Sequence, residues 1–487
     1  MTTAPEAPAR TSSTTSLDRY FSISARGSTI RRELRGGLVT FFTMAYIVVL
    51  NPLIIATPPD LAKHTLGIPQ VAAVTALVAA VMTIAMGIIG RYPFAIATGL
   101  GLNAFVAVSV ASQMTWPEAM GLVVWEGLVI TVFVVTGLRK AILRAIPPPL
   151  RTAIGVGTGL FIAIIGLVDA GVVRRIPDAA QTTVPVQLGP SGNLLGWPTS
   201  VFIVGLLLIA ALMARKVRGA ILIGIVVSTI VAIIVESIAH VGAAGAKNPG
   251  GWQLNVPRWP HHVVGTPDLS LVGHFSLGGG FARVGVLTAA FIVFTLVLSD
   301  FFDTIGTVVG VAAGGGLLDD NGELPGLGRV LVVDSLAAAA GGATSASSAT
   351  AYVESAAGVG DGARTGLASV LTGGLFVVAM FFTPLVEVAP SEAATPALVV
   401  VGALMLRQIT TLDFTDFAIA IPAFLTMVLM PFTYSITNGI GAGVVSWVFL
   451  RAISGRAREV HPLLWAVAVL FVVYFALHPI KAWLGIG

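Results

Sequence analysis

The feature that most constrains this sequence is a long series of apolar runs, most of them near the length that a helix needs to cross a lipid bilayer. A transmembrane helix takes about 20 predominantly apolar residues. Such runs lie at about residues 37–56, 70–90, 97–112, 119–138, 152–168, 199–214 and 219–237, and then at about 284–311, 329–342, 350–360, 364–386, 396–406, 416–434 and 437–453. Charged residues make up only 10% of the chain, against roughly 25% in soluble domains. The sequence therefore predicts an all-α polytopic membrane protein with about 14 transmembrane segments.

The two sets of seven runs are arranged as an inverted repeat would require. An odd number of spans in each half reverses the second half relative to the first, as is common in secondary transporters, which hold their substrate near the bilayer midplane. Residues Thr40–Val49 match Asp300–Val309 at four of ten positions, which is consistent with two repeats. One further apolar run, Leu463–Leu477, leaves two alternatives. Either it crosses the membrane, or residues 416–453 form a shorter re-entrant hairpin.

The expected division of the chain follows from these runs and from the basic loops. Lys and Arg are enriched in cytoplasmic loops, and the basic string Ala25–Gly37 therefore predicts a cytoplasmic amino terminus. The other basic strings on this side are at residues 139–151, 215–219 and 451–458. The expected segments are a disordered cytoplasmic tail (1–35), a first seven-span repeat (36–240), a polar extracytoplasmic connection (241–282), a second seven-span repeat (283–453) and a C-terminal segment (454–487).

Charge and cysteine content argue against several functional classes. The net charge is only +4, and the basic residues lie in short loops rather than along one stripe, so nothing supports a nucleic-acid partner. The chain has no cysteine, so it has neither a disulfide nor a thiolate metal site. A membrane-embedded enzyme would need a nucleophile or a set of metal ligands, and the sequence shows no such cluster. We therefore expect a protein that is not an enzyme and binds no cofactor or metal.

Three carboxylates within the apolar runs are candidate functional residues. An ionisable group at the centre of a membrane helix costs on the order of 3 kcal/mol and marks a functional site by default; Asp300, Asp303 and Glu354 all qualify. The two aspartates are three residues apart and share a helix face, so each influences the protonation of the other. The alternative is a carboxylate that is simply hydrogen-bonded to neighbouring hydroxyls. We interpret Glu126 and Asp334, which are lone carboxylates, as structural hydrogen-bonding groups between helices.

Two runs of small residues predict broken helices. Phe94–Val108 carries Asn103, and Ala343–Val359 carries Glu354. Glycine and serine weaken a helix, and backbone groups set free at membrane depth are tolerated only where protein or a cavity satisfies them. The broken ends would then be able to bind a ligand. The alternative is that these small residues only allow helices to pack closely.

Four motifs together resemble a known transporter family. They are FFTMAYIVVLNP (Phe41–Pro52), GLGLNAFVA (Gly99–Ala107), DFFDTIGT (Asp300–Thr307) and AYVESAAGVGDGARTGL (Ala351–Leu367). In this order they resemble the AzgA-like purine permeases of the nucleobase/cation symporter-2 (nucleobase/ascorbate transporter) group, which also includes uracil and xanthine permeases. The resemblance extends over nearly the whole chain.

The resemblance implies a fold and a set of site residues. It implies a core domain (about 36–138 and 283–386) and a gate domain (about 146–240 and 393–453), with the third and tenth spans partly extended as short strands that cross at the binding site.

The same resemblance implies that Glu354 and one of the two aspartates hold the base and that Asn103 contributes to purine binding. It favours Asp300 as the base contact and Asp303 as the proton-coupling residue, while their three-residue spacing also allows the reverse.

These features predict a secondary active transporter of the cell membrane that imports hypoxanthine, guanine or adenine by proton symport with an elevator-type movement. A carboxylate accepts two adjacent N–H groups of a purine, and an asparagine amide offers both a donor and an acceptor. The expected partners are the purine, the co-transported H⁺ and the bilayer. A homodimer is a further possible assembly. The alternatives are a uracil or xanthine permease, a cation channel lined by acids, and an anion transporter of the same architecture. The lack of a basic residue at the expected site argues against anions.

Overall fold

The computed structural model describes residues 16–484 except for 138–144, 177–185, 191, 246, 254, 261 and 320–322. Ten helices in this part of the chain are long and apolar enough to cross a membrane. They are Ile30–Ile55, Ile68–Gly90, Trp116–Val135, Pro148–Asp169, Gly196–Ala214, Ala220–Ala239, Val286–Gly314, Gly366–Val388, Ser391–Thr411 and Ile436–Ile453. The prediction of a mainly helical, multi-pass membrane protein is therefore confirmed.

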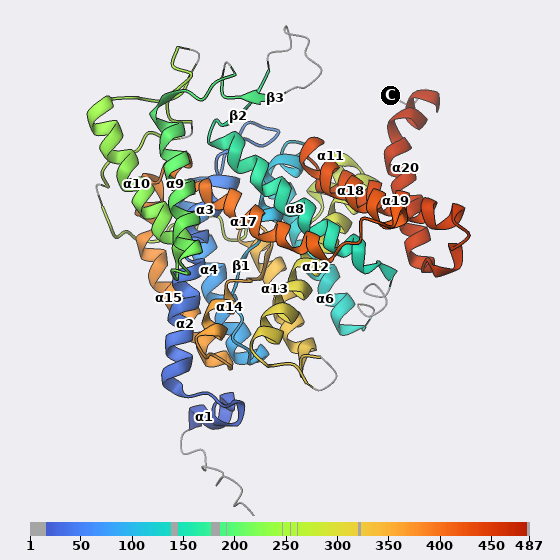
Figure 1. Ribbon diagram of the computed structural model, residues 1–487, viewed down its shortest axis with the longest axis horizontal. Helices are drawn as coiled ribbons and strands as arrows, with labels where there is room; N and C mark the ends of the chain where they lie inside the picture. Colours follow the sequence, from blue (N-terminus) through green and yellow to red (C-terminus); the bar gives the residue numbers. More distant parts are fainter. Residues whose placement is uncertain are drawn as a thin grey trace, which may run out of the picture.

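The elements of the first half follow the expected apolar runs in order (Figure 1). They are α1 (Ser16–Phe21), α2 (Ile30–Met44), α3 (Ile47–Ile55), α4 (Ile68–Ala85), β1 (Ile96–Thr98), α5 (Leu100–Phe105), α6 (Trp116–Val135), α8 (Pro148–Asp169), α9 (Gly196–Ala214) and α10 (Ala220–Ala239). Between α8 and α9, β2 (Val173–Arg175) pairs antiparallel with β3 (Val186–Leu188).

The second half again follows its runs in order. Its elements are α11 (Gly279–Val284), α12 (Val286–Gly314), α13 (Leu327–Ala343), β4 (Ala349–Ala351), α14 (Ser355–Gly360), α15 (Gly366–Ala379), α16 (Ser391–Ala394), α17 (Pro396–Leu406), α18 (Phe417–Phe432), α19 (Ile436–Ile453) and α20 (Pro462–Leu484). Residues 463–477 thus lie within one long helix, and 416–453 form two separate helices.

Local sequence signals set several helix starts. Thr115 and Glu118 form a capping box at the start of α6, where the Glu118 carboxylate accepts the Thr115 N–H at 2.8 Å. Proline stands in the first turn of α8, where its missing N–H costs nothing. The Ser435 hydroxyl accepts the Asn438 N–H at 3.3 Å and caps α19. These caps satisfy backbone donors that a helix start would otherwise leave unpaired.

The prediction of a disordered tail is wrong for residues 16–35. Residues 1–15 lie outside the described part of the chain. Residues 16–35 contain α1 and the beginning of α2. The Arg26 guanidinium lies 4.4 Å from the centre of the Tyr92 ring and donates to the backbone oxygens of Arg91 (2.8 Å) and Arg364 (3.0 Å). A Ser- and Thr-rich composition predicts disorder, but these long-range contacts give the segment a surface to dock on.

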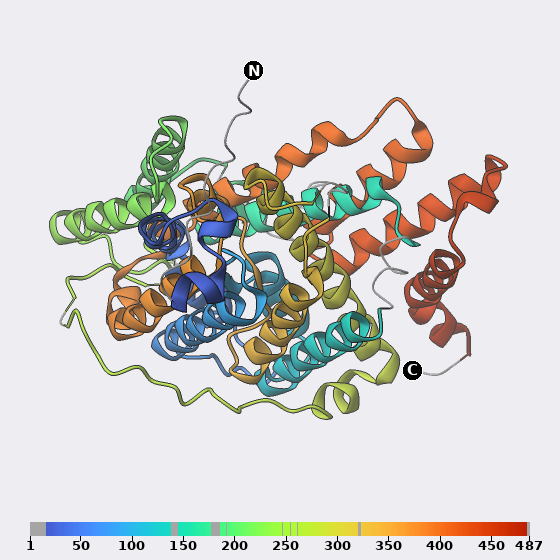
Figure 2. The same cartoon turned by 90° about the horizontal axis from the view of Figure 1, so that it is seen from below.

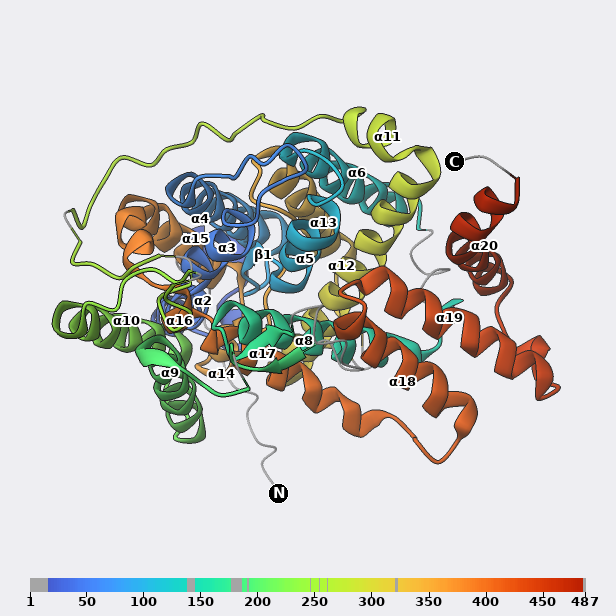
Figure 3. The same cartoon turned by 90° about the horizontal axis from the view of Figure 1, so that it is seen from above.

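The described helices form two groups (Figure 3). In the first bundle, α2–α6 pack with α12–α15; in the second bundle, α8–α10 pack with α16–α19. The described residues between α10 and α11 (241–245, 247–253, 255–260 and 262–278) run around the outside of the first bundle (Figure 3). The two bundles meet along α5, α8 and α12.

Each predicted broken run contains a short strand. β1 and β4 pair antiparallel, with Ile96 opposite Ala351 and Thr98 opposite Ala349, and both strands are buried. The Thr83 hydroxyl bonds with both the N–H and the C=O of Ile96 at 2.9 Å, and the Asp334 carboxylate accepts the Ala351 N–H at 2.9 Å. Polar side chains from neighbouring helices thus satisfy backbone groups that hydrocarbon could not.

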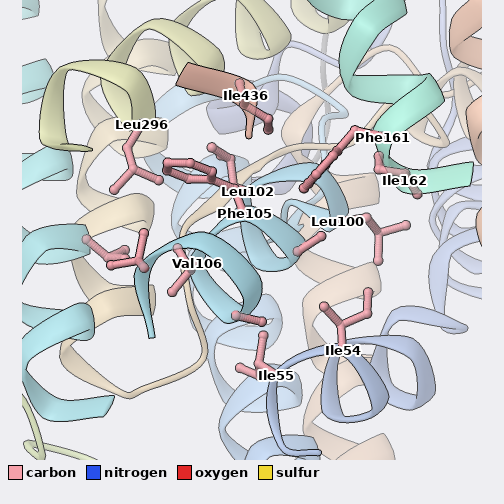
Figure 4. Packing of buried hydrophobic residues seen from close by; sticks show 14 of the residues in the cluster. Ile54, Ile55, Leu100, Leu102, Phe105, Val106, Phe161, Ile162, Leu296 and Ile436 are labelled. Carbon is pink, nitrogen blue, oxygen red and sulfur yellow. The ribbon is translucent and has the colours of Figure 1, made fainter. Parts of the chain in front are cut away.

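The surface between the bundles is apolar around α5. Figure 4 shows Leu102 and Phe105 of α5 among Leu296 of α12, Phe161 of α8 and Ile436 of α19, all in one buried cluster. Two hydrogen bonds cross the same surface: the Thr437 hydroxyl donates to Thr295 Oγ1 and the Ser109 hydroxyl donates to the backbone oxygen of Tyr434, each at 3.0 Å.

Candidate functional site

A cavity of about 340 Å³ lies between the two bundles, beside the crossing of β1 and β4. The first bundle lines it with Tyr46, Gly99, Leu100, Gly101, Leu102, Ser299, Asp303, Gly306, Thr307, Ala351, Tyr352, Val353 and Glu354. The second bundle lines it with Arg151, Ile154, Gly155, Thr158, Ile162, Val401, Leu404, Met405, Arg407 and Gln408. Small-molecule sites usually have volumes of roughly 300–1,000 Å³ and a few convergent polar groups in an apolar lining, and this cavity fits that description.

Two of the predicted carboxylates reach this cavity. Asp303 is on α12 and its side chain is exposed to the cavity. Glu354 stands directly before α14, is half-buried, and accepts a hydrogen bond from the Tyr46 hydroxyl. Tyr352 ties β4 to the other broken run by donating its hydroxyl to the backbone oxygen of Thr98 at 2.5 Å. Two carboxylates from distant segments therefore face one cavity, and one of them is held by a tyrosine.

Asp300 lies behind the cavity wall. It is fully buried, and neither carboxylate oxygen has a hydrogen-bond partner within the part of the chain described. The carboxylates of Asp334, Glu126 and Asp303 and the hydroxyl of Thr350 lie around it. Residues three apart on a helix point about 60° away from each other, and here the cavity edge passes between Asp300 and Asp303. Asp303 therefore lines the cavity and Asp300 does not, and the roles predicted for the two aspartates stay predictions.

Asp334 and Glu126 make the hydrogen bonds between elements that the sequence predicts. The Thr304 hydroxyl donates to Asp334 Oδ2 at 2.6 Å, and the Ser348 hydroxyl donates to Glu126 Oε1 at 2.9 Å. Both carboxylates are buried and contact the segment around β4. They therefore help to hold the broken run in place.

Asn103 also lies behind the wall. It is fully buried, and its amide donates to Asn51 Oδ1 at 2.6 Å. The Asn51 amide in turn donates to the Thr75 hydroxyl (2.7 Å) and to the backbone oxygen of Ala346 (2.9 Å). The preceding four residues, Gly99–Leu102, line the cavity, but Asn103 does not. Its predicted role in purine binding stays a prediction, and the geometry assigns it a role in positioning α5.

We expect Asn103→Ala to lower the free energy of unfolding by about 1–3 kcal/mol, because the buried Asn51 Oδ1 loses its donor. Thermal unfolding of the detergent-solubilised protein measures this effect. Gln113→Ala is a matched control, since Gln113 is an exposed amide with only a local bond to the Ser109 backbone oxygen. Unchanged thermal stability combined with a changed order of purine preference would instead place Asn103 in contact with the base.

Basic residues also line the cavity, and this corrects the sequence argument against anions. Arg151 is in the first turn of α8, and Arg407 and Gln408 directly follow α17. Arg151 belongs to one of the basic strings that predicted the orientation, and no role was predicted for Arg407 or Gln408. The fold brings them together because α8 begins and α17 ends at the same side of the second bundle. That is the side of the basic loops.

Comparison with known proteins confirms the family resemblance. The model of the Permease family matches residues 31–441. The guanine/hypoxanthine permease PbuG of Bacillus subtilis is 36% identical over 466 residues, which cover 94% of this chain and 99% of PbuG. The adenine permease AdeP of Escherichia coli is 35% identical over 460 residues, which cover 94% of this chain and 95% of AdeP. The motifs read from the sequence therefore point to the correct group of proteins.

Solved structures share the fold at much lower identity. The transmembrane domain of a cyanobacterium bicarbonate transporter, BicA, superposes with a TM-score of 0.58 at 13% identity and covers 85% of this chain and 97% of that domain. The murine anion transporter Slc26a9 in the inward-facing state has a TM-score of 0.58 at 12% identity and covers 92% of this chain and 74% of that one.

Proposed function

Because this chain belongs to the Permease family, we propose that it is a secondary active transporter that imports purine nucleobases, namely hypoxanthine, guanine or adenine. The observation that carries the proposal is the pair of carboxylates, Asp303 and Glu354, that faces one cavity between the bundles. A purine presents ring and exocyclic N–H donors, and an ionised carboxylate accepts two of them in a charge-assisted pair. The names of the relatives PbuG and AdeP, a guanine/hypoxanthine and an adenine permease, support this substrate class.

The transport movement that we propose follows from the position of the cavity. The first bundle corresponds to the core domain (36–138 and 283–386) and the second bundle to the gate domain (146–240 and 393–453). Each half of the chain contributes seven spans, with β1 in the third and β4 in the tenth. The core carries Asp303 and Glu354 and moves as a body against the gate, as an elevator. The amino terminus lies in the cytoplasm and the protein resides in the cell membrane.

We further propose that Asp300 carries the coupling proton. An unpaired carboxylate in a buried setting holds a charge only at high cost, and Asp300 is buried without a hydrogen-bond partner among the described residues. It lies about one helical turn from Asp303, so its protonation changes the charge of the base site. H⁺ is the only co-transported species in this scheme, and no other cofactor is required.

The coupling is tested by uptake into proteoliposomes. We expect labelled hypoxanthine to accumulate above its external concentration when an inward proton gradient is imposed and to equilibrate without accumulation when a protonophore is added. Empty liposomes under the same gradient are the control. Accumulation driven by a sodium gradient, and insensitive to the proton gradient, would contradict proton symport while leaving purine transport intact.

Anion transport is the second candidate, because Arg151 and Arg407 line the same cavity as the two carboxylates. The fold neighbours BicA and Slc26a9 are named as bicarbonate and anion transporters, but at this identity the likeness extends to the fold alone. Labelled bicarbonate uptake that purines do not compete with would favour this candidate over the first.

A further inference from the structure

The segment Gly360–Gly366 (GDGARTG) belongs to one of the motifs but has no role in the site described above. It begins at the last residue of α14, the helix that starts directly after Glu354. Its Asp361 is buried, with a side chain only 2% exposed, and carries two ion pairs. Arg35 of α2 contributes one, with Nε 2.5 Å from Oδ2, and Arg218 contributes the other, from Nη2 to Oδ1.

One side of this cluster is fixed within the first bundle. Arg35 also donates to the backbone oxygen of Asp361 at 2.9 Å. The helices α2 and α14 pack in backbone contact, since a Cβ at Gly36 would lie 2.8 Å from the Gly358 oxygen and a Cβ at Gly358 2.4 Å from the Gly36 oxygen. Glu33 accepts the backbone N–H groups of Arg364 (2.9 Å) and the residue after it (3.2 Å). Asp361, Arg35 and the helix that follows Glu354 therefore move together.

The other side comes from the second bundle. Arg218 lies in the turn between α9 and α10, and these helices pack against α17 and α16. The turn approaches α2 closely, because a Cβ at Gly219 would lie 3.1 Å from the Phe42 oxygen. In Figure 1 and, from below, in Figure 2, α9 and α10 lie beside the blue amino-terminal helices. Arg218–Asp361 is thus a charged contact between the two bundles, at the end where the basic loops lie.

We propose that the Arg218–Asp361 ion pair is a latch that stabilises the state in which the cavity faces the basic-loop side and that opens when the first bundle moves. The inference rests on the proposed alternating-access function. When one bundle slides against the other, the two charged side chains are close enough to pair in only one of the two states. The ion pair therefore stabilises that state relative to the other. Arg35 moves with Asp361 and keeps its ion pair. Arg218 stays with the second bundle and loses its ion pair. The base site and the latch lie at opposite ends of α14, so one short helix connects them.

The absence of native cysteine allows a direct test with a single reporter. Val401→Cys places a thiol in the cavity wall on the second bundle, and its labelling by a membrane-impermeant thiol reagent is followed in inside-out vesicles. We expect Arg218→Gln to lower the labelling rate by about three- to tenfold, in line with a partly exposed ion pair. Arg215→Gln is the matched control, since Arg215 lies in the same turn and makes no side-chain ion pair or hydrogen bond in the described part of the chain.

A graded series separates the latch from a general loss of structure. Arg218→Glu should lower the labelling rate more than Arg218→Gln, because it opposes the charge of Asp361, and Arg218→Lys should restore most of the original rate. A rate in Arg218→Glu equal to that of Arg215→Gln would overturn the latch. The labelling does not depend on which substrate is carried, so a failure of purine uptake with this graded order intact would reject the proposed substrate and leave the latch standing.

Discussion

Glu354→Gln is expected to weaken purine binding by at least about 100-fold, because the amide keeps the shape of the side chain but loses the charge-assisted acceptor pair. Glu354 faces the cavity and is oriented by the hydroxyl of Tyr46. The amide would also bring an N–H₂ group where the base presents its own donors, so a buried donor would stay unpaired. Equilibrium binding of labelled hypoxanthine to the detergent-solubilised protein measures the loss.

Two control variants separate the loss of charge from a general disturbance. Glu387→Gln makes the same chemical change at an exposed position outside the cavity and should leave the dissociation constant unchanged. Tyr46→Phe removes only the hydrogen bond that orients Glu354 and should weaken binding by about 10-fold, the usual value of one such bond. An unaltered dissociation constant in Glu354→Gln would remove Glu354 from the base site.

Asp303→Asn and Asp300→Asn are expected to fail in different ways, although they lie three residues apart. Asp303 faces the cavity, so its amide variant should lose purine binding by about 10-fold or more for lack of a charged acceptor. Asp300 is buried behind the wall, so its amide variant should still bind purine and exchange it across the membrane at equilibrium. It should lose accumulation driven by a proton gradient, because an amide cannot take up and release a proton.

Measurement of both exchange and gradient-driven uptake in the same proteoliposomes distinguishes these roles. Loss of binding in Asp300→Asn with normal binding in Asp303→Asn would restore the assignment that the sequence favours. Normal gradient-driven accumulation in both variants would show that neither aspartate couples transport.

The course of the chain through the membrane could be predicted from the sequence because lipid imposes a simple rule on composition. Runs of apolar residues near the required length coincide with the helices from α2 to α19, and the small-residue runs contain β1 and β4. The breaks in these two helices could be expected because glycine and serine weaken a helix, whereas the short strands followed only from the family resemblance. Their pairing partner, with Thr98 opposite Ala349, depends on two segments about 250 residues apart, and no local pattern encodes it.

The direction of individual side chains was much harder to predict. Asn103 and Asp300 are polar residues in apolar runs, as Glu354 is, but they point behind the cavity wall. The Asn51 amide that pairs with Asn103 lies in one of the motifs and was recognisable as a polar residue in an apolar run. The choice between facing a ligand and facing another helix depends on which element covers each side, and that is a property of the tertiary packing.

The basic residues of the cavity were missed for a different reason. Arg151 and Arg407 are more than 250 residues apart in sequence and stand at the edges of apolar runs, where arginine usually reports topology. Only the arrangement of α8 and α17 brings both to one cavity. The contacts of Arg26 with the first bundle could not be predicted either. The composition of the amino-terminal segment does not show which distant residues it packs against.

Competition for uptake of labelled hypoxanthine into proteoliposomes tests the central claim most directly. Unlabelled guanine, hypoxanthine, adenine, xanthine, uracil and bicarbonate are added in turn, at two external pH values, to the original protein and to Glu354→Gln. The account predicts saturable uptake that hypoxanthine, guanine or adenine inhibits, that uracil and bicarbonate leave unaffected, and that Glu354→Gln abolishes. Uptake that no purine inhibits, or that bicarbonate alone inhibits, would contradict it.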